Sequence, residues 1–131
     1  MDNEKVCVNL APVELGKIDV LVAQGLFTSR TDLIRAGIRH VLEEHAPAVE
    51  KVALGAAGIG VLVVSRKDLE DAKRDGEKLS MKVIGILSID SDVTPDLADE
   101  TIHDIRIFGT IRGPKAVITR LGKRVKHGIA P

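Results

Sequence analysis

The sequence predicts an α+β chain in two parts. The first part, residues 1–46, contains one strand and two helices, and the second contains strands that alternate with short helices. Two observations predict this division. An alternation of apolar and polar residues at positions 5–10 is followed at once by two helical patterns, and apolar runs that contain glycine recur after residue 52. The length of 131 residues suits one domain or two small ones.

Composition limits what the protein can do. Aromatic residues make up 2% of the chain, so the core must be aliphatic and stacking on single-stranded nucleic acid has almost no platform. The single cysteine, Cys7, excludes a disulfide within the chain and favours a reducing compartment. The longest apolar run, residues 52–64, contains glycines and is too short to cross a membrane. We therefore expect a cytoplasmic protein with no membrane partner.

The formal net charge is zero, but the charges are unevenly distributed. Residues 1–45 carry five Lys and Arg against seven Asp and Glu, and residues 46–121 carry eleven against twelve. Residues 122–131 carry three basic residues and no acidic one. We therefore expect a basic tail at residues 122–131, which either reaches a nucleic-acid backbone or is a solvated end of the chain.

The first expected element is a strand at residues 5–10. Its apolar positions are Val6, Val8 and Leu10, and they alternate with Lys5, Cys7 and Asn9. A lone strand cannot pair with itself, and a helical pattern follows it directly. The simplest partner is the same strand of a second copy, paired antiparallel across a two-fold axis. One face of that two-stranded ribbon would then cover the helices, and the other would face solvent.

The next two elements are helices. Pro12 suits the first turn of a helix, and Gly25 is typical of the residue that follows a helix end. A second helix is expected after the N-cap residue Ser29, with Asp32 at its third position, and Pro47 lies just past its end. The apolar stripe of the first helix is Leu15, Ile18, Leu21 and Val22, and that of the second is Leu33, Ile34, Ile38, Val41 and Leu42.

Four motifs in residues 5–45 occur in a specific order. They are the strand KVCVNL, the helix that starts at Pro12, the turn GLFTSR, and the stretch SRTDLIRAGIR at residues 29–39, which is the most specific of them. Together they resemble the ribbon-helix-helix domain of MetJ/Arc-type DNA-binding regulators. The resemblance covers roughly a third of the chain. It implies an obligate homodimer whose β-ribbon enters the major groove of double-stranded DNA.

The resemblance implies that the outward residues of the strand, Lys5, Cys7 and Asn9, contact base edges. Lysine can donate to guanine acceptors, and asparagine can form two hydrogen bonds with adenine. Cys7 departs from the polar or basic residue that is more usual in the family. Its thiol is a poor hydrogen-bonding group and would contact at most a thymine methyl.

The resemblance also implies that the start of the second helix holds a DNA phosphate. The residues concerned are Thr28, Ser29 and Arg30. They would donate through the backbone around Ser29 and Arg30 and through the hydroxyls of Thr28 and Ser29, next to the positive end of the helix dipole. Such contacts position a protein on DNA without reading its sequence.

The second part of the chain contains a weak internal repeat. GVLVV begins at Gly60, GILSI at Gly85 and GTIRG at Gly109, so the glycines are spaced by 25 and 24 residues. Short helices are expected between the strands, one capped by Ser65 and one by Thr94. A period of this length predicts stacked strand–turn–helix units, which form a small solenoid. A compact α/β domain built from the same strands is the alternative.

We therefore expect a ribbon-helix-helix dimerisation domain at residues 1–46, a linker at 47–52, an oligomerisation domain at 53–121 and a basic tail at 122–131. Exposed strand edges at the ends of a solenoid favour assembly, so the second domain is expected to join dimers. A weak likeness of KVIGILSI and RIFGTI to bactofilins, which are β-solenoid cytoskeletal proteins, points the same way.

No motif predicts catalysis, a cofactor or a metal. GAAGIG lacks the spacing of a dinucleotide-binding loop, and DSDVTPD lacks the glycine and terminal glutamate of a calcium loop. His40 and His45 lie five residues apart on a helix, which does not direct two rings at one ion. We therefore expect no enzyme, no cofactor and no metal site.

The sequence thus predicts a sequence-specific DNA-binding transcriptional regulator, most simply a repressor. One alternative is a plasmid partition or nucleoid-organising protein that polymerises on DNA. Another is the antitoxin of a toxin–antitoxin pair. Antitoxin tails are often disordered until they bind, whereas residues 81–121 are apolar and regular.

Overall fold

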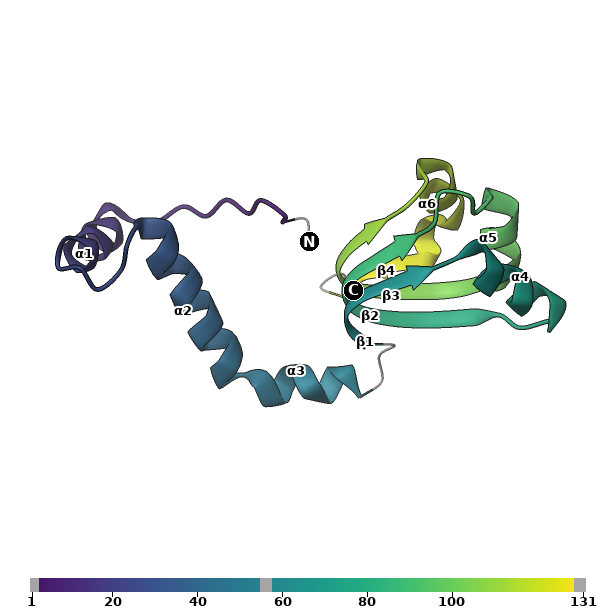
Figure 1. Ribbon diagram of the computed structural model, residues 1–131, viewed down its shortest axis with the longest axis horizontal. Helices are drawn as coiled ribbons and strands as arrows, with labels where there is room; N and C mark the ends of the chain where they lie inside the picture. The colour runs from purple at the N-terminus through teal and green to yellow at the C-terminus, as the bar shows by residue number, and fades with distance from the viewer. Residues whose placement is uncertain (1–2, 55–57, 129–131) are drawn as a thin grey trace. The chain divides into compact units, whose positions relative to one another are not determined.

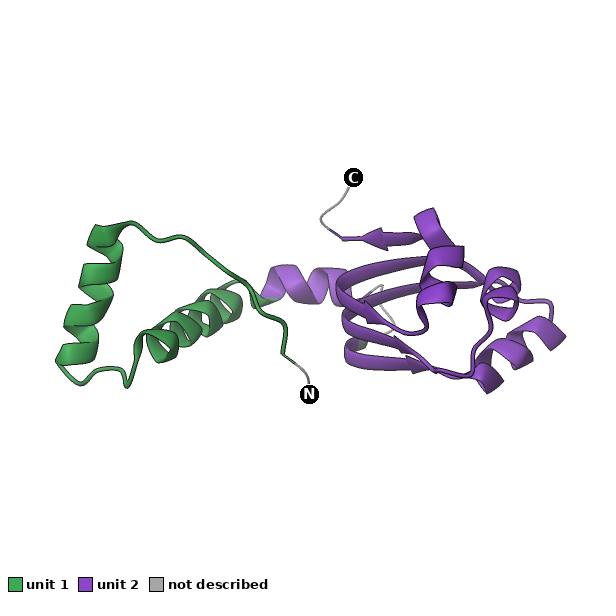
Figure 2. Ribbon diagram, turned by 90° about the horizontal axis from the view of Figure 1, so that it is seen from above, with its two compact units in different colours: residues 1–46 green, residues 47–131 purple. Residues whose placement is uncertain are grey.

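The computed structural model describes residues 3–54 and 58–128. The chain divides into two compact units, unit 1 at residues 1–46 and unit 2 at residues 47–131 (Figure 2). Helix α3 (Ala46–Ala53) starts at this division. A linker is expected at residues 47–52, and the structure has helix there. Proline is tolerated in a first helical turn, so Pro47 does not prevent this helix.

Unit 1 contains helices α1 (Pro12–Ala23) and α2 (Arg30–Glu44) (Figure 1). Their ends confirm the sequence signals. Pro12 is the first residue of α1, and Gly25 follows its C-cap with a φ of 79°. The Ser29 side chain caps α2, because its Oγ accepts the backbone N–H of Asp32 at 3.0 Å. Local chemistry therefore sets both helices.

Unit 1 has little core of its own. No residue of α1 or α2 is buried. The expected stripe of α1 is half-buried, and so is Leu33 of α2. The rest of the α2 stripe stays open to solvent, with exposed fractions of 40% for Ile34, 54% for Ile38, 52% for Val41 and 57% for Leu42. The unit therefore leaves much of its apolar surface for another molecule to cover.

Unit 2 contains a four-stranded parallel sheet whose strands lie in sequence order. The strands are β1 (Gly58–Val64), β2 (Leu79–Ile89), β3 (Ile102–Arg112) and β4 (Val125–His127). Helices α4 (Arg66–Arg74), α5 (Pro95–Thr101) and α6 (Lys115–Leu121) connect them, and the 3-10 turn η1 (Gly122–Arg124) leads into β4. Helix α5 contacts both α4 and α6. The helix starts again confirm the expected caps, because Ser65 Oγ accepts from Asp68 N and Thr94 Oγ1 accepts from Leu97 N.

The core of unit 2 is aliphatic, as the scarcity of aromatic residues predicts. It consists of residues from the strands, the helices and one loop: Val64, Leu69, Val83, Leu87, Ile89, Val93, Leu97, Ala98, Ile102, Ile105, Ile107, Val117 and Leu121. The buried hydroxyl of Thr101 donates to the carbonyl of Leu97 at 2.6 Å, so it has a hydrogen-bond partner. None of the described helices is long and apolar enough to span a bilayer.

The repeat glycines lie side by side in the sheet. Gly60 is in register with Gly85, and Gly85 with Gly109. Their φ angles are 123°, 124° and 128°, and β2 and β3 bend sharply part-way along their length in Figure 1. A Cβ on Gly85 would lie 2.1 Å from the carbonyl oxygen of Gly60, so the backbones approach closely here. Unit 2 is therefore a parallel sheet whose strands are connected by helices, and the repeat glycines lie in register across three of its strands.

The expected basic tail belongs largely to unit 2. Residues 122–127 form η1 and β4, and β4 pairs with β3. Arg124 Nη1 donates to the carbonyl oxygens of Asp99 and Ile102 at 3.1 Å each, and its Nη2 contacts the Asp99 carboxylate. The Arg124 guanidinium therefore binds the C-terminal end of α5, where a positive charge is favourable because it lies at the negative end of the helix dipole.

Candidate nucleic-acid interface

Residues 3–10, where the sequence predicts a ribbon strand, form neither helix nor strand in the single chain. Residues 5–10 make no backbone hydrogen bond to another residue in the ranges 3–54 and 58–128. Their apolar side chains are open, with Val6 81% and Val8 73% exposed. A segment with unpaired backbone groups and open apolar side chains can form a strand once a second strand lies beside it. The strand itself therefore stays a prediction for the dimer.

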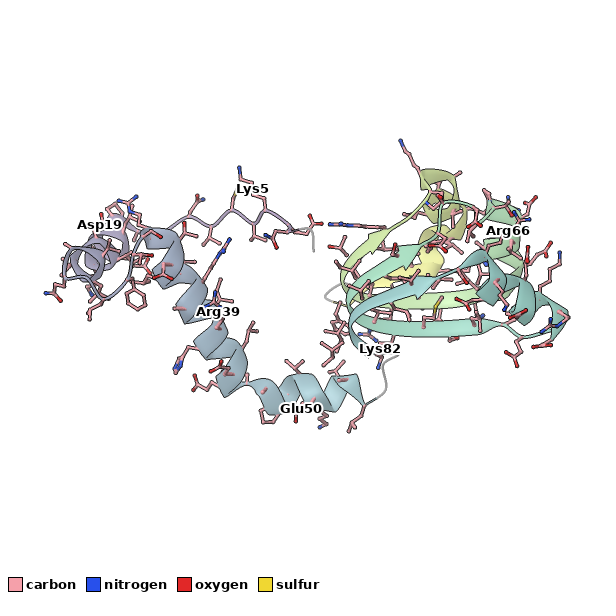
Figure 3. The ribbon with its side chains drawn as sticks, in the orientation of Figure 1. Lys5, Asp19, Arg39, Glu50, Arg66 and Lys82 are labelled. Atoms are coloured by element: carbon pink, nitrogen blue, oxygen red, sulfur yellow. The ribbon has the colours of Figure 1, made fainter. Side chains whose placement is uncertain are left out.

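The three expected base-contacting residues are exposed on this segment. Figure 3 shows the Lys5 side chain projecting away from the backbone. In an extended strand Lys5, Cys7 and Asn9 share one face, and four residues span about 13 Å. That length equals about four base steps at 3.4 Å along one DNA strand. The segment can therefore present all three side chains to adjacent bases.

An apolar groove of about 680 Å³ lies on unit 1 beside this segment. Its lining combines the end of the segment with both helices: Leu10, Glu14, Ile34, Gly37, Ile38, Val41 and Leu42. Leu10 and four of the exposed α2 residues thus line one surface. A second unit 1 placed against it would bury the stripe that the single chain leaves open.

The expected phosphate-contacting residues lie together at the start of α2. Ser29 caps the helix, and Thr28 N–H donates to the Asp32 carboxylate at 3.0 Å. Within the part of the chain that the structure describes, the backbone N–H groups of Arg30 and Thr31 have no hydrogen-bond partner. These groups and the hydroxyls of Thr28 and Ser29 remain able to donate to an anion.

The guanidinium of Arg30 is already occupied. Its Nε and Nη2 donate to the two carboxylate oxygens of Asp19 on α1, at 2.7 and 2.8 Å. Hydrogen bonding to Arg30 lowers the pKa of Asp19, and hydrogen bonding to Asp19 raises the pKa of Arg30. The paired arginine adds little net positive charge at the helix start. The sequence analysis did not find Asp19, because it lies eleven residues away on another helix.

Within residues 3–54 and 58–128, no group of three or more His, Cys, Asp or Glu side chains is arranged to hold a metal ion. Several charged side chains of unit 2 instead join neighbouring elements, as in the ion pairs between Lys73 and Glu100 and between Arg120 and Asp96. The surface that merits comparison with known proteins is therefore the one on unit 1.

The whole arrangement can be compared with known protein families. Residues 1–118 match the model of the Ribbon-Helix-Helix transcriptional regulator family. The chain belongs to this family. Membership confirms the resemblance found in residues 5–45, and it implies DNA binding and dimerisation. The match extends through unit 2 into α6, so the family includes the strand–helix repeat as well as the N-terminal helices.

The chain is also similar to a curated protein whose name does not describe a regulator. Nodulation protein A of Rhizobium leguminosarum bv. trifolii is 30% identical over 97 residues, which are 73% of this chain and 50% of the relative. The chain thus spans about half the length of the relative that it matches. No solved structure matches the chain. Among these comparisons, the family membership is what bears on the interface of unit 1.

Proposed function

We propose that this ribbon-helix-helix protein is a repressor that reads a DNA operator with a β-ribbon formed by two copies of residues 5–10. Lys5, Cys7 and Asn9 contact bases in the major groove. The single observation that carries the proposal is the open segment of residues 5–10, which is apolar at alternate positions and belongs to a unit with no buried residue among residues 3–46. A second copy supplies hydrogen-bond partners for the backbone of residues 5–10 and covers their apolar side chains at the same time.

In this proposal the start of α2 fixes the register on the DNA. Thr28, Ser29 and Arg30 hold a phosphate through hydroxyl and backbone donors, with the Arg30 guanidinium held by Asp19. Phosphate contacts supply much of the affinity of DNA-binding proteins, and residues 1–45 carry more acidic than basic residues. A single dimer therefore binds modestly, and several dimers on adjacent sites bind more tightly.

Unit 2 supplies the joint between dimers in this proposal. Adjacent half-sites then lie about one helical turn, or roughly 10 bp, apart. The protein acts in the cytoplasm and performs no catalysis, and repression follows from occupancy of the operator. Protection of a defined operator is expected, in contrast to the spreading of a nucleoid organiser.

The test is an unbiased selection of bound DNA with the full chain, followed by footprinting. Asn9→Ala should relax the preference at the bases it reads by about 1–3 kcal/mol, because a bidentate contact to adenine is lost. Gln24→Ala is the matched control, since it removes an exposed amide at the end of α1. If Asn9→Ala and Gln24→Ala select the same sequences while both remain dimeric, the segment does not read the bases.

A further inference from the structure

Strand β1 is an open edge of the sheet in unit 2. It pairs with β2 on one side, and no strand in the ranges 3–54 and 58–128 pairs with its other side. It is seven residues long and reads GIGVLVV, with no charge and no proline. Proteins protect edge strands with lysine, proline, bulges or a short length. β1 contains no lysine or proline, no bulge interrupts its pairing with β2, and at seven residues it is longer than β4.

The side chains of β1 that face away from the core are also open. Ile59, Val61 and Val63 are 63%, 56% and 53% exposed. They alternate with residues on the core side of the same strand, where Val64 is only 4% exposed. The strand therefore offers an unpaired backbone edge and a row of β-branched side chains, which pack well across a strand pair.

The opposite edge of the sheet is protected. Strand β4 is three residues long and contains Lys126 and His127. Both side chains are exposed. A short and charged edge resists the addition of another strand. The two edges of the sheet therefore differ, and β4 offers β1 of a second molecule only a short, charged edge.

Two observations identify what covers β1. The strand is uncharged, so a second β1 meets it without like-charge repulsion, whereas β4 presents charges. In addition, dimerisation through unit 1 brings a second unit 2 into the same dimer, because residues 45–57 join each unit 2 to its unit 1. Tethering raises the effective concentration of the second strand to roughly millimolar values for short linkers.

We infer that β1 is a self-association edge, which pairs antiparallel with β1 of a second copy of this chain. Identical edges related by a two-fold axis pair in this way, and the contact is isologous. The described part of unit 2 has one such edge, so each β1–β1 contact joins only two copies. This inference rests on the proposed function, in which unit 2 joins dimers, and it names the contact through which unit 2 does so.

Spin labels on the full chain, without DNA, test the contact. The label is placed at Val61→Cys in a chain that carries Cys7→Ser. A strand of seven residues is about 23 Å long, so two labels on paired β1 strands should lie within about that distance. The matched control places the label at Thr119→Cys, an exposed position on α6 of the same unit, where no short distance is expected.

A second variant separates pairing from mere proximity. Val63→Lys, made in the Val61-labelled chain, should abolish the short distance and the hydrogen-exchange protection of those β1 amides that do not bond to β2. Val63 is exposed, so unit 2 should keep its thermal transition. A β1 label without a short distance overturns the inference. So does a short distance that Val63→Lys leaves unchanged, with unprotected amides on the open edge of β1.

Light scattering on the same samples addresses the proposed function independently. A mass that falls to that of a dimer in Val63→Lys means that β1 joins dimers. A mass that stays dimeric while the short distance is lost means that β1 pairs within one dimer, so the inference holds and the proposed joint between dimers fails. DNA selection on Val63→Lys alone, in a chain that keeps Cys7, reports on the repressor proposal separately, because β1 lies in unit 2 and the expected readers lie in unit 1.

Discussion

Replacing Gly85 by alanine should destabilise unit 2 more than the same replacement at Gly60. Both glycines have a φ near 124°, namely 123° and 124°. A residue with a Cβ in such a conformation costs about 1–3 kcal/mol. The two sites differ in space, because a Cβ on Gly60 meets nothing within 4 Å, whereas one on Gly85 lies 2.1 Å from the Gly60 carbonyl oxygen.

The additional effect at Gly85 follows from that distance. The oxygen belongs to the backbone of β1, so it can move only if β1 and β2 separate by about 1 Å. Such a shift takes hydrogen bonds of the ladder out of good geometry, and each is worth about 1 kcal/mol. With at least two bonds affected, Gly85→Ala should cost at least about 2 kcal/mol more than Gly60→Ala.

Circular dichroism is the suitable assay, because the chain has no tryptophan or tyrosine to report unfolding by fluorescence. For a unit of this size, 1 kcal/mol changes Tm by about 4–8 °C, so the two variants should differ by at least about 8 °C. Hydrogen exchange of peptides from β2 and β3 assigns the transition to unit 2. The comparison is made at one protein concentration, since the chain dimerises.

Equal destabilisation by the two alanines would refute this reasoning. It would mean that β1 and β2 do not approach closely at the glycines, and that the backbone conformation alone accounts for both effects. A larger effect at Gly60 than at Gly85 would mean that the glycine register between these strands differs from the one described.

Four other predictions concern single side chains. Ser65→Ala should cost unit 2 about 1 kcal/mol in urea unfolding, because it removes the cap of α4, and an unchanged midpoint would argue against that cap. The hydrogen bond from Arg124 is the main cause that lowers the pKa of Asp99 from 3.8, so the stabilising effect of Asp99 is complete above pH 3.8 and is lost as the pH falls below it. Asp99→Asn should therefore reduce the loss of stability at acid pH in unfolding experiments, and an unaltered acid dependence would exclude Asp99 as its source. Asp19→Asn should free the Arg30 guanidinium, tighten DNA binding and steepen its salt dependence by about one unit in a log–log plot, whereas an unchanged slope would show that this arginine meets no phosphate. Val8→Glu should prevent dimerisation and DNA binding in sizing and binding experiments, and a DNA-binding dimer of this variant would contradict the ribbon.

The helices were largely predictable from sequence because their signals are local. Ser29, Ser65 and Thr94 accept backbone N–H groups three residues along the chain, where the expected caps place them. Gly25 has the positive φ that its place after α1 predicts. The 25- and 24-residue spacing of the repeat glycines likewise anticipated their register in the sheet. Such features depend on neighbours in sequence or on a regular period.

The features that the sequence did not predict depend on contacts between distant residues. Asp19 and Arg30 lie on different helices, and only their geometry shows that the arginine at the expected phosphate site is already paired. Arg124 falls within the expected basic tail, but it binds carbonyls at the end of α5, and β4 then extends the sheet.

The sequence by itself thus determined helices α1, α2, α4 and α5, the caps at Ser29, Ser65 and Thr94, the repeat, and the need of residues 5–10 for a partner strand, because spacing and side-chain type act over a few residues. The tertiary structure alone decided which charges are paired and which edge of the sheet is open. Those properties depend on contacts between segments far apart in the chain, and no local sequence pattern predicts such contacts.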